Sequence, residues 1–260
     1  MSKTWDAIVI GGGAAGLFCA GVAGQLGKRV LVLDHAEVLG EKIRISGGGR
    51  CNFTNLHSSP ANFLSLNQHF VKSALARYPS SEFIKLVTAY KIGYHEKHQG
   101  QLFCDDSAKQ IIEMLFAECA KGKVTIRHPV TIQSILQDKD LWAVHTNAGI
   151  EKAKSVVMAT GGLPVPAIGA TAYSLDVAKQ FGLKVVEPRP ALVPLSFTAD
   201  NFGNLNELAG LSVPVRIASG SKGHRYGACR FNEDLLLTHK GLSGPAVLQA
   251  SSYCQFTTNL

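Results

Sequence analysis

The sequence has little charge, and none of it is concentrated. Charged residues make up 17% of the 260 residues, and no run of five or more lysines and arginines occurs. The hydrophobic share of 46% excludes intrinsic disorder, which needs low hydrophobicity and high charge. The net charge of +7 suits a phosphate-bearing ligand. Because no basic cluster is present, we predict no nucleic-acid partner.

The sequence also lacks a cysteine framework, a membrane segment and a metal motif. Its six cysteines are scattered and form no C-x-x-C pair, which excludes a disulfide scaffold in a chain without a secretory signal. The uncharged stretch 7–27 is interrupted by Gly11–Gly13, so it predicts neither a membrane helix nor a signal peptide. The run His95–His98 lacks the H-E-x-x-H spacing. We expect a cytoplasmic protein with no membrane partner and no metal.

Glycine is abundant, with 26 residues against a usual share of about 7%. Apolar runs predict strands at 7–10 and 29–33, with a helix at 14–26 between them. The turn Gly11-Gly12-Gly13-Ala14-Ala15-Gly16 fits G-x-G-x-x-G, and Asp34 ends the second strand. This context indicates a dinucleotide site, in which the glycines admit a pyrophosphate and the acid binds ribose hydroxyls.

The rest of the chain predicts further α/β structure. We expect a polar loop at 40–55, helices at 63–77, 81–90, 107–120 and 174–181, a hairpin at 93–103 and a strand at 124–127. A β-meander is predicted at 131–136, 141–146 and 149–154. A separate buried strand at 155–159 precedes Thr160-Gly161-Gly162, and the chain is β-rich from Leu192 onward.

A second glycine-rich segment, residues 46–55 (SGGGRCNFTN), distinguishes FAD from NAD as the ligand. Its small residues let the backbone approach a ligand, and Arg50, Asn52 and Asn55 offer hydrogen-bond donors for phosphate or flavin edges. A dehydrogenase that binds NAD(P) without flavin has no need of this segment.

These motifs, with the PRPALVPL (188–195) and THKGLSGPAVLQAS (238–251) strings, resemble the BaiN-like (YhiN-like) family of bacterial FAD-dependent oxidoreductases. The resemblance implies a Rossmann-like, glutathione-reductase-like FAD-binding domain with a β-meander at 1–190, and a partial β-rich inserted domain at 191–260. Family chains continue further and carry a Gly-Glu…Asp-Gly pattern, whereas this sequence has no Gly-Asp dipeptide. We therefore expect that the C-terminal part of the family is absent here.

The resemblance also implies cofactor-binding residues. The first turn would hold the pyrophosphate and Asp34 the adenosine ribose. The residues that would line the flavin side are Lys42, Gly48, Arg50, Cys51 and Asn52. Val130 would meet adenine through its backbone, and the 160–162 turn would pass close to the cofactor. The full predicted set is Gly11, Gly12, Gly13, Ala14, Ala15, Gly16, Asp34, Lys42, Gly48, Arg50, Cys51, Asn52, Val130, Thr160, Gly161 and Gly162.

The implied function is an FAD-dependent oxidoreductase. NAD(P)H would reduce the flavin, which would pass a hydride to an unsaturated or carbonyl-bearing small-molecule substrate. Two alternatives stay open: a non-catalytic FAD- or nucleotide-binding fragment, and an NAD(P)-binding dehydrogenase without flavin. The sequence predicts neither a catalytic acid or base nor an oligomeric state.

Overall fold

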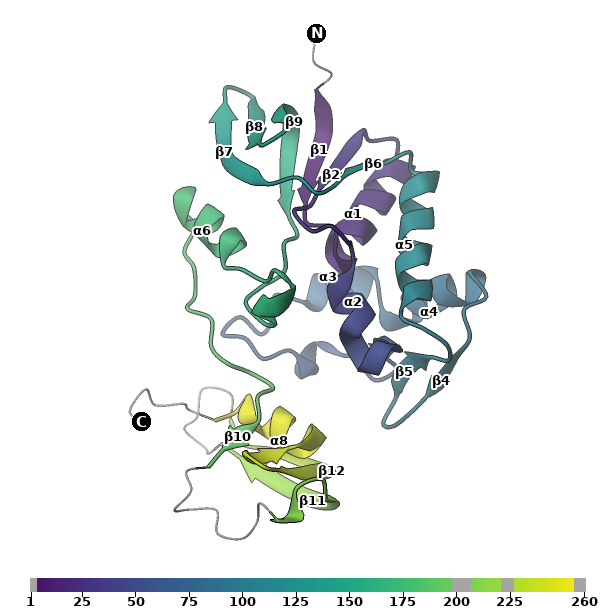
Figure 1. Cartoon of the computed structure of the whole chain (residues 1–260), viewed down its shortest axis with the longest axis vertical. Coiled ribbons are helices and arrows are strands. Elements are labelled where there is room, and N and C mark those ends of the chain that lie inside the picture. The colour runs from purple at the N-terminus through teal and green to yellow at the C-terminus, as the bar shows by residue number, and fades with distance from the viewer. Residues whose placement is uncertain (1–3, 198–206, 221–226, 255–260) are drawn as a thin grey trace. The chain divides into compact units, whose positions relative to one another are not determined.

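The computed structural model describes residues 4–197, 207–220 and 227–254. The chain divides into two compact units, one made of residues 1–60 and 72–185, the other of residues 61–71 and 186–260. Figure 1 shows the helices and strands of both units. The assignment of 1–190 to FAD binding and 191–260 to a partial inserted domain stays a prediction.

A six-stranded mixed sheet forms the centre of the first unit. Its strand order is β6-β2-β1-β9-β8-β7. The neighbours β6, β2, β1 and β9 are parallel, and β8 and β7 add antiparallel strands. The strands are β1 (Trp5–Ile10), β2 (Val30–Leu33), β6 (Thr125–Arg127), β7 (Ile132–Asp138), β8 (Leu141–Thr146) and β9 (Gly149–Met158). Ile10 pairs with Leu33 and Met158, so three parallel strands end side by side.

Helices cover both faces of this sheet. Successive strand residues point to opposite sides, and apolar residues of the strands lie on both sides. On one face, α1 (Ala14–Gln25) and α5 (Lys109–Lys121) pack against Val9 and Val32. On the other, Val177 of α6 (Tyr173–Gln180) packs in a second cluster with Ile8. Every residue of β2 is buried, as expected for a parallel strand covered on both sides.

The segment 40–55 is more ordered than the predicted loop. It contains α2 (Glu41–Ile45), a 3-10 turn (Ser46–Gly49) and β3 (Asn52–Asn55). Glu41 and Arg44 form an ion pair at 2.8 Å one turn apart. Strand β3 pairs with β5 (Gln101–Cys104), which also pairs with β4 (Tyr94–Glu96) in the predicted hairpin. The pairing of β3 is a contact between distant segments, which local periodicity does not reveal.

The predicted helix 63–77 is wrong over most of its length. Only α3 (Lys72–Arg77) forms, after a 3-10 turn at Pro60–Asn62. The Ser65 hydroxyl accepts the amide of Asn67 at 3.2 Å, and the Asn67 side chain accepts the amide of His69 at 3.0 Å. Such local side-chain bonds compete with helix formation. The next helix, α4 (Ser80–Ala89), lies close to its predicted range.

The two strands predicted at 149–154 and 155–159 form one strand, β9. Its first half pairs with β8 of the meander and its second half with β1, so the same strand serves both parts of the sheet. The strand therefore carries the chain from the meander to Thr160, beside the turn after β1.

The second unit contains a four-stranded antiparallel sheet in the order β10-β13-β12-β11. Its strands are β10 (Leu195–Ser196), β11 (Ser212–Ser219), β12 (Cys229–Thr238) and β13 (Gly241–Ser243). A helix not predicted from the sequence, α8 (Gly244–Ser251), packs on this sheet. Pro245 at its first turn is the local signal that favours a helix start.

Candidate functional site

The turn after β1 brings three backbone segments into close contact. Gly11 has φ +112°, and a Cβ there would collide with the carbonyl oxygen of Ala159 at the end of β9. A Cβ on Gly16 would collide with the carbonyl oxygen of Gly11. Gly13 differs, since a Cβ on it would meet nothing within 4 Å. Gly11 and Gly16 thus serve packing, whereas Gly13 keeps space open at the N-terminus of α1.

Asp34 at the end of β2 fastens this turn. One carboxylate oxygen accepts the amide of Gly12 at 2.5 Å, and the other accepts the amide of Ala36 at 2.8 Å. Its side chain is only 14% exposed. A carboxylate offers about four acceptor positions, so two bonds to the backbone leave capacity for hydroxyl donors of a ligand.

A cleft of about 490 Å³ opens beside the turn, at the carboxyl ends of β1, β2 and β9. The exposed side chain of Lys42 lines it, and its Nζ lies 3.6 Å from where a Cβ on Gly161 would stand. Among the described residues, Lys42 has no ion-pair partner. The predicted residues that line the cleft are Gly11, Gly13, Ala14, Ala15, Asp34, Lys42, Thr160 and Gly161.

The remaining predicted residues do not line this cleft. Gly12 and Gly16 are buried, and neither they nor Gly162 belong to its lining. Val130 is buried, and its amide donates to the carbonyl oxygen of Asp34 at 2.7 Å. Because this amide is already hydrogen-bonded, a backbone contact of Val130 with a ligand would have to use its carbonyl oxygen.

The other predicted residues belong to the segment whose strand β3 pairs with β5, and they do not line the cleft: Gly48, Arg50, Cys51 and Asn52. Arg50 is exposed, and its carbonyl accepts the amide of Cys104 at 2.9 Å. Cys51 is buried, which raises the pKa of its thiol. The role of these four residues on the flavin side stays a prediction.

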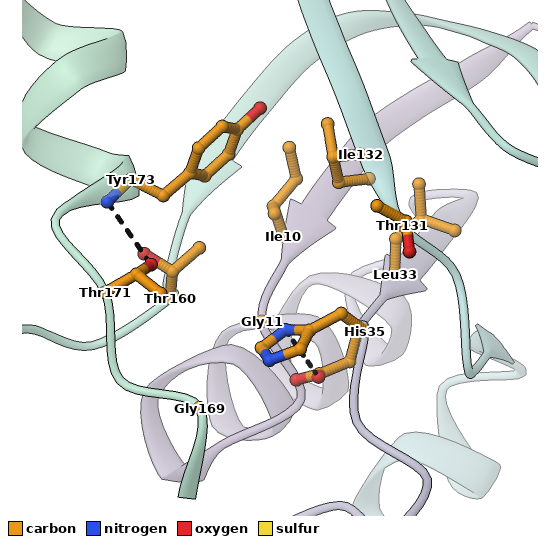
Figure 2. A pocket seen from close by; sticks show the side chains of 11 residues that line it. Ile10, Gly11, Leu33, His35, Thr131, Ile132, Thr160, Gly169, Thr171 and Tyr173 are labelled. Atoms are coloured by element: carbon orange, nitrogen blue, oxygen red, sulfur yellow. Dashed lines mark hydrogen bonds and ion pairs between the residues drawn. The ribbon is translucent and has the colours of Figure 1, made fainter. Parts of the chain in front are cut away.

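A smaller cavity of about 210 Å³ adjoins the cleft (Figure 2). Ile10, Leu33 and Ile132 supply apolar walls, and the Tyr173 ring faces them. The hydroxyls of Tyr173 and Thr160 are buried without a hydrogen-bond partner among the described residues. Burial also raises the pKa of Tyr173.

Sequence reasoning missed most of the small cavity. The lining residues that it did not include among the site residues are Ile10, Leu33, His35, Thr131, Ile132, Gly169, Thr171 and Tyr173. His35 and Thr131 each follow a predicted site residue directly, so their position at a strand end was a usable signal. Gly169 and Thr171 carried no such signal, because the segment after β9 follows no regular period.

Parallel strands that end at a helix N-terminus and a cleft define a Rossmann-type nucleotide-binding domain. Residues 5–251 match the HI0933-like protein Rossmann domain, and the chain belongs to this family. The fold class expected from the sequence is confirmed, and so is the resemblance at the level of the family.

Three relatives extend the comparison. The ribosomal RNA dihydrouridine synthase of Escherichia coli is 48% identical over 97% of this chain and 62% of its own length. The protein of the same name from Haemophilus influenzae is 47% identical over 100% of this chain and 64% of its own. The 3-dehydro-bile acid delta(4,6)-reductase of Clostridium scindens is 24% identical over 94% of this chain and 59% of its own length. The chain thus spans about three fifths of the length of these relatives.

The prediction of no nucleic-acid partner is contradicted by the first two relatives, whose name specifies ribosomal RNA. That prediction relied on the absence of lysine and arginine runs. Contacts to phosphates come from residues that converge in space, and RNA is recognised largely by shape and by splayed bases. A run of basic residues in the sequence is therefore not required.

Within the part of the chain that the structure describes, no helix has the length and apolar character needed to cross a membrane.

Proposed function

We propose that the chain binds FAD in this cleft and forms the cofactor-binding part of an FAD-dependent oxidoreductase. One observation carries the proposal: the N-terminus of α1 and the Asp34 carboxylate meet in one cleft at adjacent parallel strand ends. The residues fit a dinucleotide. A side chain at Gly13 would fill the open space before α1, and the first amides of a helix have no partner within it.

Each part of the cleft suits one part of the ligand. The amides and positive end of α1 attract a pyrophosphate at Gly13–Ala15, and the Lys42 ammonium adds a cation to the same cleft. The unused acceptor positions of Asp34 suit ribose hydroxyls. When bound, FAD would supply hydride transfer between a nicotinamide and an unsaturated substrate. The chain's own residues bind and orient it.

The names of the relatives favour a conjugated carbon–carbon double bond as the reducible group. Dihydrouridine is uridine with hydrogen added across the C5–C6 bond, which is conjugated to a carbonyl. The third relative's name also describes reduction of double bonds beside a ketone. We therefore propose uracil in ribosomal RNA as the substrate of the whole protein, with NADH or NADPH giving the hydride and a proton completing the addition.

Cofactor binding is tested by the visible spectrum of the purified protein and by identification of what heat releases. We expect a flavin spectrum and FAD in the supernatant. A colourless protein that fails to take up added FAD, yet binds NADH or NADPH, would contradict the proposal and favour a dehydrogenase without flavin.

The substrate is tested by incubating the protein, loaded with FAD, with unmodified ribosomal RNA and NADPH or NADH. We expect uridine to gain two hydrogens at a defined position, measured by mass spectrometry of the digested RNA. The matched control is Gly13→Val, which should hold no cofactor. Reduction of a steroid enone with no change in the RNA would contradict the RNA substrate while leaving the oxidoreductase class intact.

A further inference from the structure

The cleft and the smaller cavity adjoin each other and form a large and a small compartment of one binding site. Five residues line both: Gly11, Asp34, His35, Thr160 and Gly169. Two of them are glycines, and the Thr160 hydroxyl is buried. The Asp34 carboxylate is held by backbone amides. His35 is therefore the one large side chain in this shared set, and its side chain is 60% exposed.

The imidazole of His35 is held from two sides. Its Nδ1 lies 3.5 Å from a carboxylate oxygen of Asp34. Its Nε2 lies 2.6 Å from where a Cβ on Gly169 would stand, so the ring packs directly against the Gly169 backbone. Figure 2 shows His35 and Gly169 on the same side of the small cavity. Any side chain at position 169 would displace the ring.

The compartments differ in chemistry. The large one presents the amides of α1 and the Lys42 ammonium, which suit phosphates. The small one presents apolar walls and an aromatic ring, which suit a flat base. Asp34, at the junction, suits a sugar. This order of groups matches a base, a ribose and a diphosphate.

Resting on the proposed function, we propose that His35 contacts the adenosine half of FAD, and that Gly169 positions its imidazole for this contact. His35 is thus a ligand-binding residue, and Gly169 is a positioning residue that acts only through it. Because the contact is made to adenosine and not to flavin, ADP alone should reveal it.

The test is a double-mutant cycle with FAD and ADP dissociation constants from titration calorimetry. We expect His35→Ala and Gly169→Ala each to weaken both ligands about tenfold. The double variant should be no weaker than His35→Ala alone, since Gly169 acts through the removed ring. Gly182→Ala is the matched control: Gly182 has φ +72° against +84° at Gly169, but a Cβ on it would meet nothing within 4 Å. It should bind both ligands as the wild type does.

Unchanged affinity of His35→Ala for ADP, or a Gly169→Ala loss that persists in the His35→Ala background, would overturn the inference. Equal losses in Gly169→Ala and Gly182→Ala would assign the effect to backbone strain and overturn it as well. A wild-type protein that binds neither FAD nor ADP contradicts the proposed function itself, which separates the two failures.

Discussion

The two glycine-rich segments of the first unit use glycine for different purposes. In the turn 11–16, missing side chains let β1, α1 and the end of β9 touch, and Gly13 leaves space in a cleft. In the 3-10 turn Ser46–Gly49, three successive glycines have φ of +58°, +66° and +85°, and Gly47 packs on the Phe103 ring. There, glycine lets the chain turn so that β3 can pair with β5. A high glycine content alone does not distinguish a turn that leaves space in a cleft from a turn that needs glycine for its backbone angles.

The largest expected effect separates the roles of two glycines within the turn 11–16. Gly16→Val should lower the free energy of unfolding by about 3 kcal/mol or more, because its side chain would collide with the backbone of Gly11. Gly13→Ala should lower it by about 1 kcal/mol at most, the cost of a poorer helix cap. Chemical denaturation measures both. Equal losses would show that Gly13 is also a packing position.

The next effect concerns binding. Gly13→Val should weaken FAD and ADP at least about 100-fold, since the side chain would occupy the open space before α1. Its stability should stay close to that of Gly13→Ala. Fluorescence titration of FAD, with ADP as competitor, provides the measurement. Normal affinity in a folded Gly13→Val protein would move the ligand away from this helix end.

The second segment is tested by Arg50→Ala, which removes an exposed cation that the family resemblance places on the flavin side. If that prediction holds, FAD should bind about tenfold more weakly and ADP should bind unchanged, because ADP has no flavin. The same titrations measure both ligands. Unchanged FAD affinity would make the segment a structural turn only, and equal losses for FAD and ADP would place Arg50 at the other half of the ligand.

The last expected effect is chemical and is measured as a labelling rate, so it does not rank with the binding and unfolding effects. Burial is the main cause that raises the pKa of Cys104 to about 11, and it also raises that of Cys51. A raised pKa keeps the thiol in its unreactive protonated form. At pH 8, Cys104 should therefore be alkylated about 200-fold more slowly in the native protein than in the unfolded chain. Labelling should accelerate as pH rises toward 11. Mass spectrometry of peptides after iodoacetamide treatment checks this, and rapid labelling of native protein at pH 8 would show that the β3–β5 region opens.

The predictable part of the site is local in sequence. Gly11, Gly13 and Asp34 follow from one βαβ motif, in which strand, turn and acid lie within about 30 residues. The same motif predicted a parallel sheet, whereas the FAD-binding fold class was implied by the resemblance to the family. Most of the small cavity was not predicted, since Ile132, Gly169 and Tyr173 come from separate segments that only the folded sheet brings together. Likewise β3 depends on pairing with β5, a contact that no local pattern encodes.

An equilibrium titration of the purified protein with FAD, repeated at saturating ADP, tests most directly whether the cleft at the ends of β1, β2 and β9 holds FAD. We expect one FAD per chain and its displacement by ADP, because both ligands need the α1 N-terminus and Asp34. FAD binding that ADP leaves unchanged would contradict the claim, as would the absence of any FAD binding.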